Sequence, residues 1–347
     1  MDKNRPGART RIVFVHGFSG TPQTTWGDLP DLVYDDPDLP SLRVTNWGYK
    51  TGIFRKCTGI KDIADLLITR LCESAKSYDQ IILVGHSIGG LIVLKALVDE
   101  MVERQAAQRA PLDRIERIAL FATPLDRDLV QRLIRNLIGS LPGYVARKIF
   151  GNRQLRDLHE RELIERLRVD VINRIYPPSA GRNKDSQRHI PIHTFVAEAD
   201  SVVTEAAVRG WFRDPPPRMI EGTDHTTIKM PPRRDDLRYR LLADVFEMVI
   251  GPWFRKLVGQ ALARSRPMRH SAFWKLQQAY MHPLNARLGQ VGKEFATWDL
   301  GRQLREQRKL LTLVLKQATR YPGDPVGRLL DNAMLEYAQL LPKSGRV

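Results

Sequence analysis

Mainly apolar runs of strand length alternate along the first 260 residues with stretches whose apolar positions recur at helical spacing. The runs are apolar at successive positions, which is typical of strands that are buried on both faces of a parallel sheet. We expect strands at residues 11–18, 42–47, 81–84, 115–123, 190–196 and 218–220. We expect helices at residues 60–71, from about 88 to 108, at 129–141 and at 235–260.

The alternation of strands and helices predicts an α/β protein with a mostly parallel, doubly wound sheet and right-handed crossovers. Ligands bind to such sheets at the carboxyl ends of the strands. Four residues with chemical interest follow the expected strands at this end: His16, Ser87, Pro124 and Asp200. The functional site is therefore expected where these four residues meet.

Two segments fall outside the expected sheet. Residues 125–189 are rich in arginine and helical in pattern, and we interpret them as a lid inserted between two strands. Residues 265–347 follow the last core helix as a basic helical tail, joined to it by a linker at 264–267. We therefore expect a main domain at residues 1–264 and a C-terminal extension at residues 265–347.

The chain of 347 residues is strongly basic, with 55 Lys and Arg against 39 Asp and Glu, a formal net charge of +16 and a pI of about 10.1. The tail contributes half of the excess, with 14 basic and six acidic residues. Such a charge favours an acidic partner, and anionic membrane lipid is one candidate. Docking of the tail on its own core, a protein partner and self-association through the tail helices are alternatives. Nucleic acid is not expected, because no nucleic-acid motif accompanies the charge.

The two cysteines, Cys57 and Cys72, form neither a disulfide framework nor a metal-binding spacing, which suits a reducing cytosol. The first eleven residues are polar and give no sign of a secretory signal. No run reaches the ~18 apolar residues of a membrane-spanning helix. A cytoplasmic protein is expected, with peripheral membrane contact as an addition.

The stretch Gly85-His86-Ser87-Ile88-Gly89 lies between an apolar strand and an apolar helix. A serine on such a sharp turn has strained backbone angles and an exposed hydroxyl group. Gly85 and Gly89 are required because side chains would collide where the strand and the helix meet. This context predicts a nucleophile elbow with Ser87 as the nucleophile.

Serine needs a base to take its proton, and the base needs an acid to orient it. His225 is the histidine that follows the last strand and precedes the last core helix, so it is the expected base. Asp200, just past the strand at 190–196, is the expected acid. The competing carboxylates are Glu198, Asp126, Asp128 and Asp224. We expect the backbone N–H groups of Phe18 and Ile88 to bind the oxyanion, because both belong to turns where backbone can approach a substrate.

Several segments resemble a known family: 15–20 with Thr25-Trp26, the elbow at 85–91, Ala122-Thr123-Pro124, and the loops at 200–203 and 224–228. Over roughly residues 10–250 the chain resembles the serine-active-site (SERAC1-like) and GPI inositol-deacylase-like lipases of the α/β-hydrolase superfamily. The resemblance implies an α/β-hydrolase fold and hydrolysis of esters, often on a lipid, without a cofactor. One departure is Leu125-Asp126 after Pro124, where that group often has His-x-Gly. The residues expected to contact the substrate are His16, Gly17, Trp26, His86 and Leu125.

The expected function is therefore a cytosolic serine hydrolase of carboxylic esters, with acyl esters of lipids as the substrate class, acting through Ser87, His225 and Asp200. A thioesterase or peptidase with the same residues is the enzymatic alternative. The alternative from another class is a cationic binding module that uses the hydrolase core as a scaffold. No metal and no cofactor are expected.

Overall fold

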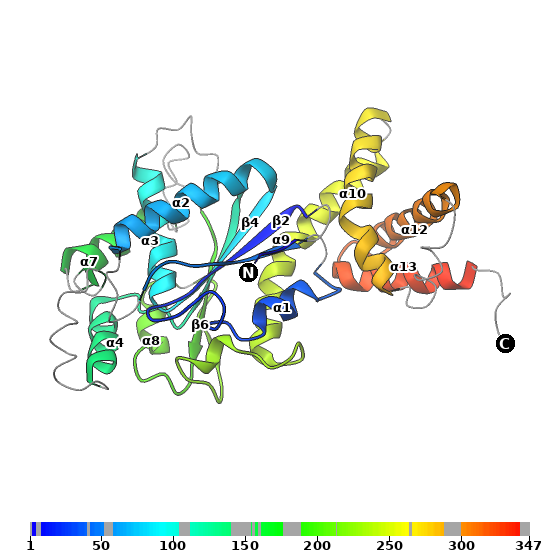
Figure 1. The fold of residues 1–347 in the computed structure, drawn as a ribbon. Helices are drawn as coiled ribbons and strands as arrows, with labels where there is room; N and C mark the ends of the chain where they lie inside the picture. Colours follow the sequence, from blue (N-terminus) through cyan, green and yellow to red (C-terminus); the bar gives the residue numbers. More distant parts are fainter. Residues whose placement is uncertain are drawn as a thin grey trace. The chain divides into compact units, whose positions relative to one another are not determined.

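A seven-stranded sheet forms the centre of the computed structural model (Figure 1). The structure describes residues 2–4, 8–39, 42–51, 58–103, 112–139, 154, 157–158, 161–175, 189–212, 214–263, 266–287 and 300–340. Cys57, the linker residues Arg264 and Ser265, and much of the expected lid at 125–189 lie outside the described residues.

The strand order in the sheet is β1-β3-β2-β4-β5-β6-β7. Strands β4 to β7 pair in parallel, and in register Val84 lies opposite Ala119 and Ala119 opposite His193. The bounds of the strands are β1 Asp2–Asn4, β2 Thr10–Val15, β3 Leu42–Trp47, β4 Gln80–His86, β5 Ile115–Phe121, β6 Ile192–Ala197 and β7 Arg218–Ile220. The six strands expected from the apolar runs are all present, and the short edge strand β1 is an addition.

Helices follow the strands as the apolar spacing predicted. Their bounds are α1 Leu29–Tyr34, α2 Ile60–Ser77, α3 Ile88–Glu103, α4 Arg127–Gly139, α7 Arg161–Asp170, α8 Glu205–Arg209, α9 Leu237–Leu262, α10 Arg266–Arg287, α12 Leu300–Arg320 and α13 Val326–Leu340. The parallel strands connected by helices confirm the mostly parallel α/β architecture.

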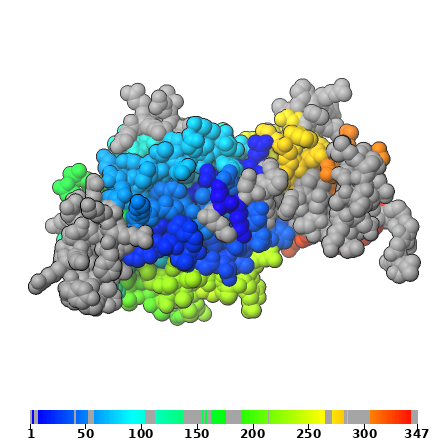
Figure 2. Space-filling view, in the orientation of Figure 1, coloured from blue at the N-terminus to red at the C-terminus, as the bar shows by residue number. Residues whose placement is uncertain are grey.

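The two faces of the sheet bury different side chains, because successive residues of a strand point to opposite faces. On one face, Val13, Leu83 and Ile118 pack in a cluster with α2 and α3, which lie side by side on that side of the strands (Figure 1). Figure 2 shows α2 beside the N-terminal strands on the face drawn.

The opposite face of the sheet buries aromatic rings. Trp26 packs edge-on against Phe14 at 5.0 Å and against Phe121 at 6.2 Å, and Phe121 stacks on Phe195 at 4.5 Å. Aromatic rings of this size contribute a large share of the free energy of burial. Both faces are therefore covered, as the continuous apolar strands required.

The described residues divide into two compact units. The first contains Met1–Lys3, Arg11–Leu32 and Val44–Val245, and the second contains Asn4–Thr10, Val33–Arg43 and Phe246–Val347. The division along the chain falls inside α9, whereas the sequence indicated a boundary at residue 264; that boundary stays a prediction.

The second unit has its own apolar cluster, formed by the second half of α9 with α10, α12 and α13. Polar contacts connect its helices: the Tyr337 hydroxyl group donates to Glu306 at 2.8 Å, and Gln317 donates to Glu336 at 2.8 Å. The backbone N–H of Val326, at the start of α13, donates to Glu247 at 3.1 Å. The tail is helical where it is described, as expected. Among the described helices, none is both long and apolar enough to cross a membrane.

His193 in β6 is a buried histidine, with 4% of its surface exposed. Neither ring nitrogen has a hydrogen-bond partner within the described residues. Burial, followed by the positive charges of Arg117 and Arg218, lowers the pKa of His193 to about 4. The folded protein therefore keeps this ring neutral while the unfolded chain protonates it near its ordinary pKa of 6.5.

We expect His193 to make the protein less stable as the pH falls from about 6.5 to about 4, because the unfolded state then binds a proton that the folded state does not. The contribution amounts to about 3 kcal/mol of the free energy of unfolding. Urea unfolding of wild type and His193→Leu between pH 7 and pH 4.5 measures it. The variant should lose less stability over this range; an equal loss in both proteins would contradict the expectation.

Candidate active site

Ser87 lies on the turn between β4 and α3, and its backbone is strained. Its φ angle is +52°, in the left-handed region that non-glycine residues rarely adopt. The turn is held by the backbone N–H of Ser87, which donates to the carbonyl of Phe121 in β5 at 2.9 Å. The strained backbone expected of an elbow serine is confirmed, but the expected exposure is not, because only 3% of the surface of Ser87 is exposed.

The glycines around Ser87 have no room for a side chain. A Cβ atom on Gly85 would lie 2.6 Å from the Cα atom of Gly90, and one on Gly89 would lie 2.4 Å from the carbonyl oxygens of Val15 and His16. These obstacles are backbone atoms, which cannot rotate away. The glycine spacing therefore reflects close contact of β4, α3 and the loop after β2.

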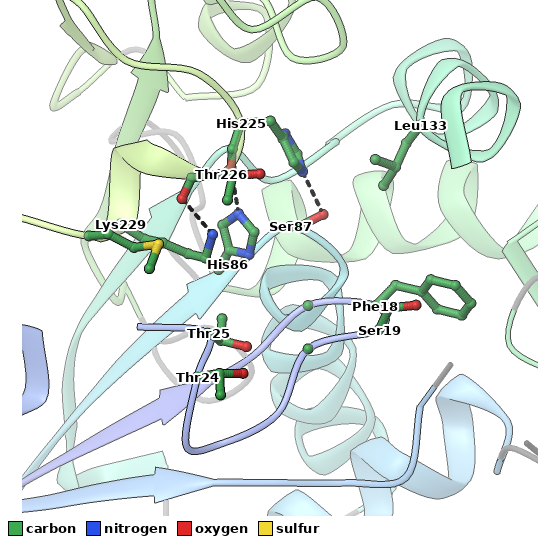
Figure 3. Close-up of a pocket in the computed structure, with 13 residues that line it drawn as sticks. Phe18, Ser19, Thr24, Thr25, His86, Ser87, Leu133, His225, Thr226 and Lys229 are labelled. Carbon is green, nitrogen blue, oxygen red and sulfur yellow. Dashed lines mark hydrogen bonds between the residues drawn. The ribbon is translucent and has the colours of Figure 1, made fainter. Parts of the chain in front are cut away.

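A chain of hydrogen bonds connects Asp200, His225 and Ser87. His225 Nδ1 lies 2.8 Å from Asp200 Oδ2. His225 Nε2 lies 3.1 Å from Ser87 Oγ (Figure 3). Because an ionised carboxylate only accepts, Nδ1 carries the proton and Nε2 presents its lone pair to the serine hydroxyl group. Residues from the ends of β4 and β6 and from the loop after β7 thus meet at one edge of the sheet.

Asp200 is held in place by its own loop. Its side chain is completely buried, and its Oδ1 atom accepts the backbone N–H groups of Val202 at 2.8 Å and Val203 at 3.0 Å. The other carboxylate oxygen is left for His225. A buried carboxylate held by three hydrogen bonds has little freedom to move.

The competing carboxylates have other positions and other partners. Glu198 accepts the N–H of Gly222, Asp126 accepts the N–H of Leu129 at the start of α4, and Asp224 accepts the N–H groups of Thr226 and Thr227. Asp128 is exposed in the first turn of α4. Of the five carboxylates considered, Asp200 is the one that contacts His225.

A cavity of about 340 Å³ opens beside Ser87. Its lining residues are Gly17, Phe18, Ser19, Gly20, Thr24, Thr25, His86, Ser87, Leu133, His225, Thr226, Lys229 and Met230. Gly17 and His86 line it as expected for substrate-contacting residues. Leu133 comes from α4, so the inserted segment contributes to the cavity (Figure 3).

Three residues expected to contact the substrate do not line this cavity. Trp26 is 1% exposed and packs against aromatic rings, and Leu125 is completely buried in the core. His16 is also fully buried: its ring stacks on Tyr49, Nδ1 donates to the carbonyl of Gly17, and Nε2 accepts the Tyr49 N–H. These side chains support the loop after β2 from behind, because apolar and aromatic contacts draw them into the interior.

The expected oxyanion donors, Phe18 and Ile88, lie in the two turns that flank Ser87. Ile88 is the first residue of α3, so its N–H has no partner in the preceding turn of helix. No hydrogen bond within the described part of the chain uses the N–H of Phe18 or of Ile88. Both are available to an oxygen atom bound next to Ser87.

Two cavity residues have pKa values that burial shifts strongly. Burial, then the charges of Lys229 and His225, lowers the pKa of His86 well below 6.5. Burial lowers the pKa of Lys229 to about 8, opposed by Asp224. The cavity wall therefore contains the neutral ring of His86 and the ammonium group of Lys229, whose charge Asp224 balances only in part.

Sequence reasoning missed Lys229, Thr24, Thr25, Leu133 and Met230 as cavity residues. Lys229 gave a signal, because a lysine between Ile228 and Met230, four residues after His225, sits in an apolar stretch beside the expected base. Thr24 and Thr25 gave no such signal, since residues with hydroxyl groups are common in turns. Among the described residues, no cluster of histidine, cysteine, aspartate or glutamate could hold a metal ion.

Comparison with known proteins supports this architecture. The model of the alpha/beta hydrolase family matches residues 12–240, and the chain belongs to this family. The comparisons identify the superfamily and do not single out the serine-active-site or inositol-deacylase-like lipases. No curated protein matches the chain.

Solved structures of α/β hydrolases resemble the chain at low sequence identity. A monoacylglycerol lipase from Paleococcus ferrophilus is 15% identical, with 71% of this chain and 96% of that chain covered and a TM-score of 0.46. An esterase from Pyrococcus furiosus is 14% identical, with 70% of this chain and 82% of that chain covered and a TM-score of 0.44. Mouse alpha/beta hydrolase domain-containing protein 10 is 16% identical, with 73% of this chain and 94% of that chain covered and a TM-score of 0.43.

We expect Gly89→Ala to destabilise the protein by at least about 2 kcal/mol, because the new methyl group meets two backbone carbonyls and the turn must open. Gly259→Ala is the matched control: it adds the same methyl group in the interior of α9, where no atom lies within 4 Å. The control should be neutral or stabilising by about 0.5–1 kcal/mol. Urea unfolding of both variants measures the free energies of unfolding. Similar values for the two variants would contradict the expectation, because the elbow would then accommodate a methyl group at residue 89.

Proposed function

We propose that the protein is a serine hydrolase that cleaves carboxylic esters, with acyl esters of lipids as its substrate class. The observation that carries the proposal is the continuous hydrogen-bond chain from the buried Asp200 through His225 to the strained Ser87. Family membership agrees with hydrolysis as the reaction type. In this proposal Ser87 is the nucleophile, His225 the base and Asp200 the orienting acid.

The first half of the reaction forms an acyl-enzyme. His225 Nε2 takes the proton of the Ser87 hydroxyl group while Oγ forms a bond to the carbonyl carbon of the ester. The carbonyl oxygen becomes negatively charged and accepts the N–H groups of Phe18 and Ile88. When the bond to the alcohol breaks, His225 returns the proton to the leaving oxygen.

The second half releases the acid. Water replaces the alcohol, His225 takes a proton from it, and the resulting hydroxide forms a bond to the acyl carbon. The tetrahedral intermediate collapses, Ser87 leaves with the proton from His225, and a carboxylic acid is released. Asp200 keeps its negative charge throughout and stabilises the imidazolium form of His225.

The cavity supports an ester with an apolar acyl group. Phe18, Leu133 and Met230 offer apolar surface, whereas Ser19, Thr24 and Thr25 offer hydroxyl groups for a polar substituent. Leu133 lies on the amphipathic α4, whose buried face includes Leu129 and Val130. The same residues would also serve a thioesterase or a peptidase, which the choice of substrate in the assay distinguishes.

Fluorophosphonate labelling tests whether Ser87 is activated. The wild-type protein should be labelled at Ser87, because the reagent reacts with serines whose proton is taken by a base. Ser87→Ala should not be labelled. Ser77→Ala is the control, since this exposed serine at the end of α2 should not affect labelling. Wild-type protein that remains unlabelled would favour the binding-module alternative.

Substitution of the acid tests how His225 is oriented. Asp200→Asn keeps an oxygen for Val202 and Val203 but places an N–H donor against His225 Nδ1, which favours the wrong tautomer. We expect kcat on a short-chain ester to fall by up to ~10⁴-fold while the circular dichroism spectrum is unchanged. Glu198→Gln and Asp126→Asn are controls and should retain near-normal kcat; a larger loss in either would reassign the acid.

A further inference from the structure

Two successive carbonyl groups of the loop that carries His225 are bound by buried side chains. The ring of His86 lies 2.9 Å from the carbonyl oxygen of His225, and Lys229 Nζ donates to the carbonyl oxygen of Thr226 at 2.6 Å (Figure 3). The loop connects β7 to the short helix at Thr227–Lys229. Neither contact is part of the bond chain from Asp200 to Ser87.

His86 connects the backbone of the loop to the strand that carries the nucleophile. His86 is the last residue of β4 and directly precedes Ser87. His225 therefore meets the end of β4 at two points: its carbonyl oxygen contacts His86, and its ring contacts Ser87. Two successive residues, His86 at the end of β4 and Ser87 in the following turn, therefore contact the backbone and the ring of His225.

The contact with His86 shows which of its ring nitrogens carries a proton. A carbonyl group only accepts hydrogen bonds, so the His86 Nε2 atom carries the proton. His86 is 6% exposed, and burial lowers its pKa well below 6.5, so the ring carries one proton at neutral pH. The other nitrogen, Nδ1, has no partner within the described residues, which agrees with an unprotonated atom.

Lys229 holds the next peptide of the same loop. Its side chain is buried, with 4% of the residue exposed, and its stem lines the cavity. Thr226 has a second contact: its N–H donates to the Asp224 carboxylate at 2.8 Å. Thr226 is therefore held at both its N–H and its carbonyl group, which leaves the adjacent His225 little freedom to shift.

We propose that His86 and Lys229 are positioning residues for His225, which hold the carbonyl groups of His225 and Thr226 and so set the separation between the imidazole and Ser87. The proposal rests on the catalytic roles proposed for Ser87 and His225. Asp200 fixes one ring nitrogen, but a ring held at one atom still moves with its backbone. The two carbonyl contacts remove that motion, and a displacement of about 1 Å at a reacting group can cost ~10²-fold in rate.

The test compares substitutions that remove each donor with substitutions that keep one. His86→Leu removes the donor at similar volume, and His86→Gln retains a terminal N–H group. We expect His86→Leu to lower kcat on a short-chain ester by at least about tenfold per fluorophosphonate-titrated site, because the imidazole and Ser87 no longer keep their separation. His86→Gln should recover most of the loss. Lys229→Met and Lys229→Arg should form a second pair with the same pattern.

His193→Leu is the matched control, since it makes the same substitution at another buried histidine, in β6, and should leave kcat unchanged. Unchanged kcat per site in folded His86→Leu would overturn the proposal, even if that variant were less stable. His86→Gln with no more activity than His86→Leu would also overturn it, because the role would then belong to ring packing.

Proton NMR supplies a readout that does not depend on hydrolysis. The Nδ1–H group of a histidine bonded to a carboxylate gives a downfield signal, which for His225 should be present in wild type and His86→Gln and broadened or lost in His86→Leu. An unchanged signal in His86→Leu would contradict the proposal. If the wild-type protein is not labelled and hydrolyses no ester, the proposed function fails, and the NMR comparison alone decides whether His86 positions His225.

Discussion

The close approach of β4, α3 and the loop after β2 is the constraint on which the rest of the site depends. Gly85 and Gly89 permit this approach because backbone atoms occupy the space where their side chains would be. The turn places Ser87 at a φ angle of +52°, and packing of the surrounding strands and helix maintains this strain. The same approach brings the loop after β2 close to the serine: a Cβ atom on Gly17 would lie 3.0 Å from the Cβ atom of Ser87.

Burial determines the charges around this turn. His86 and His16 lie in the interior, and burial lowers the pKa of both, so neutral rings surround the serine. Asp200 is a buried carboxylate that three hydrogen bonds compensate, whereas Lys229 is a buried amine with a pKa lowered to about 8. Polar groups in a region with little water interact strongly, and the buried Asp200 and Lys229 therefore require partners. The hydrogen bonds of the loop after β7 follow from this requirement.

Much of the fold was predictable from the chain because the apolar runs are continuous. Runs such as that before Ser87 are typical of strands covered on both faces, and six strands were expected and found. The short edge strand β1 escaped prediction because Asp2–Asn4 is polar and only three residues long. His16, Trp26 and Leu125 were expected in the cavity because they follow strands or turns near the site. Sequence position does not show to which side of a loop a side chain points, and all three point into the core.

The sequence by itself determined the α/β class and the elbow at Ser87, and it indicated His225 as the base, because glycine spacing and strand ends carry local information. Only the tertiary structure decided which carboxylate contacts His225, since Asp200, Glu198 and Asp224 differ in hydrogen-bond partners and hardly in local sequence. It also decided that His86 and Lys229 hold the loop of His225. Such contacts join residues that are far apart in the chain, as His86 and His225 are at a sequence separation of 139, and their geometry exists only after the sheet has formed.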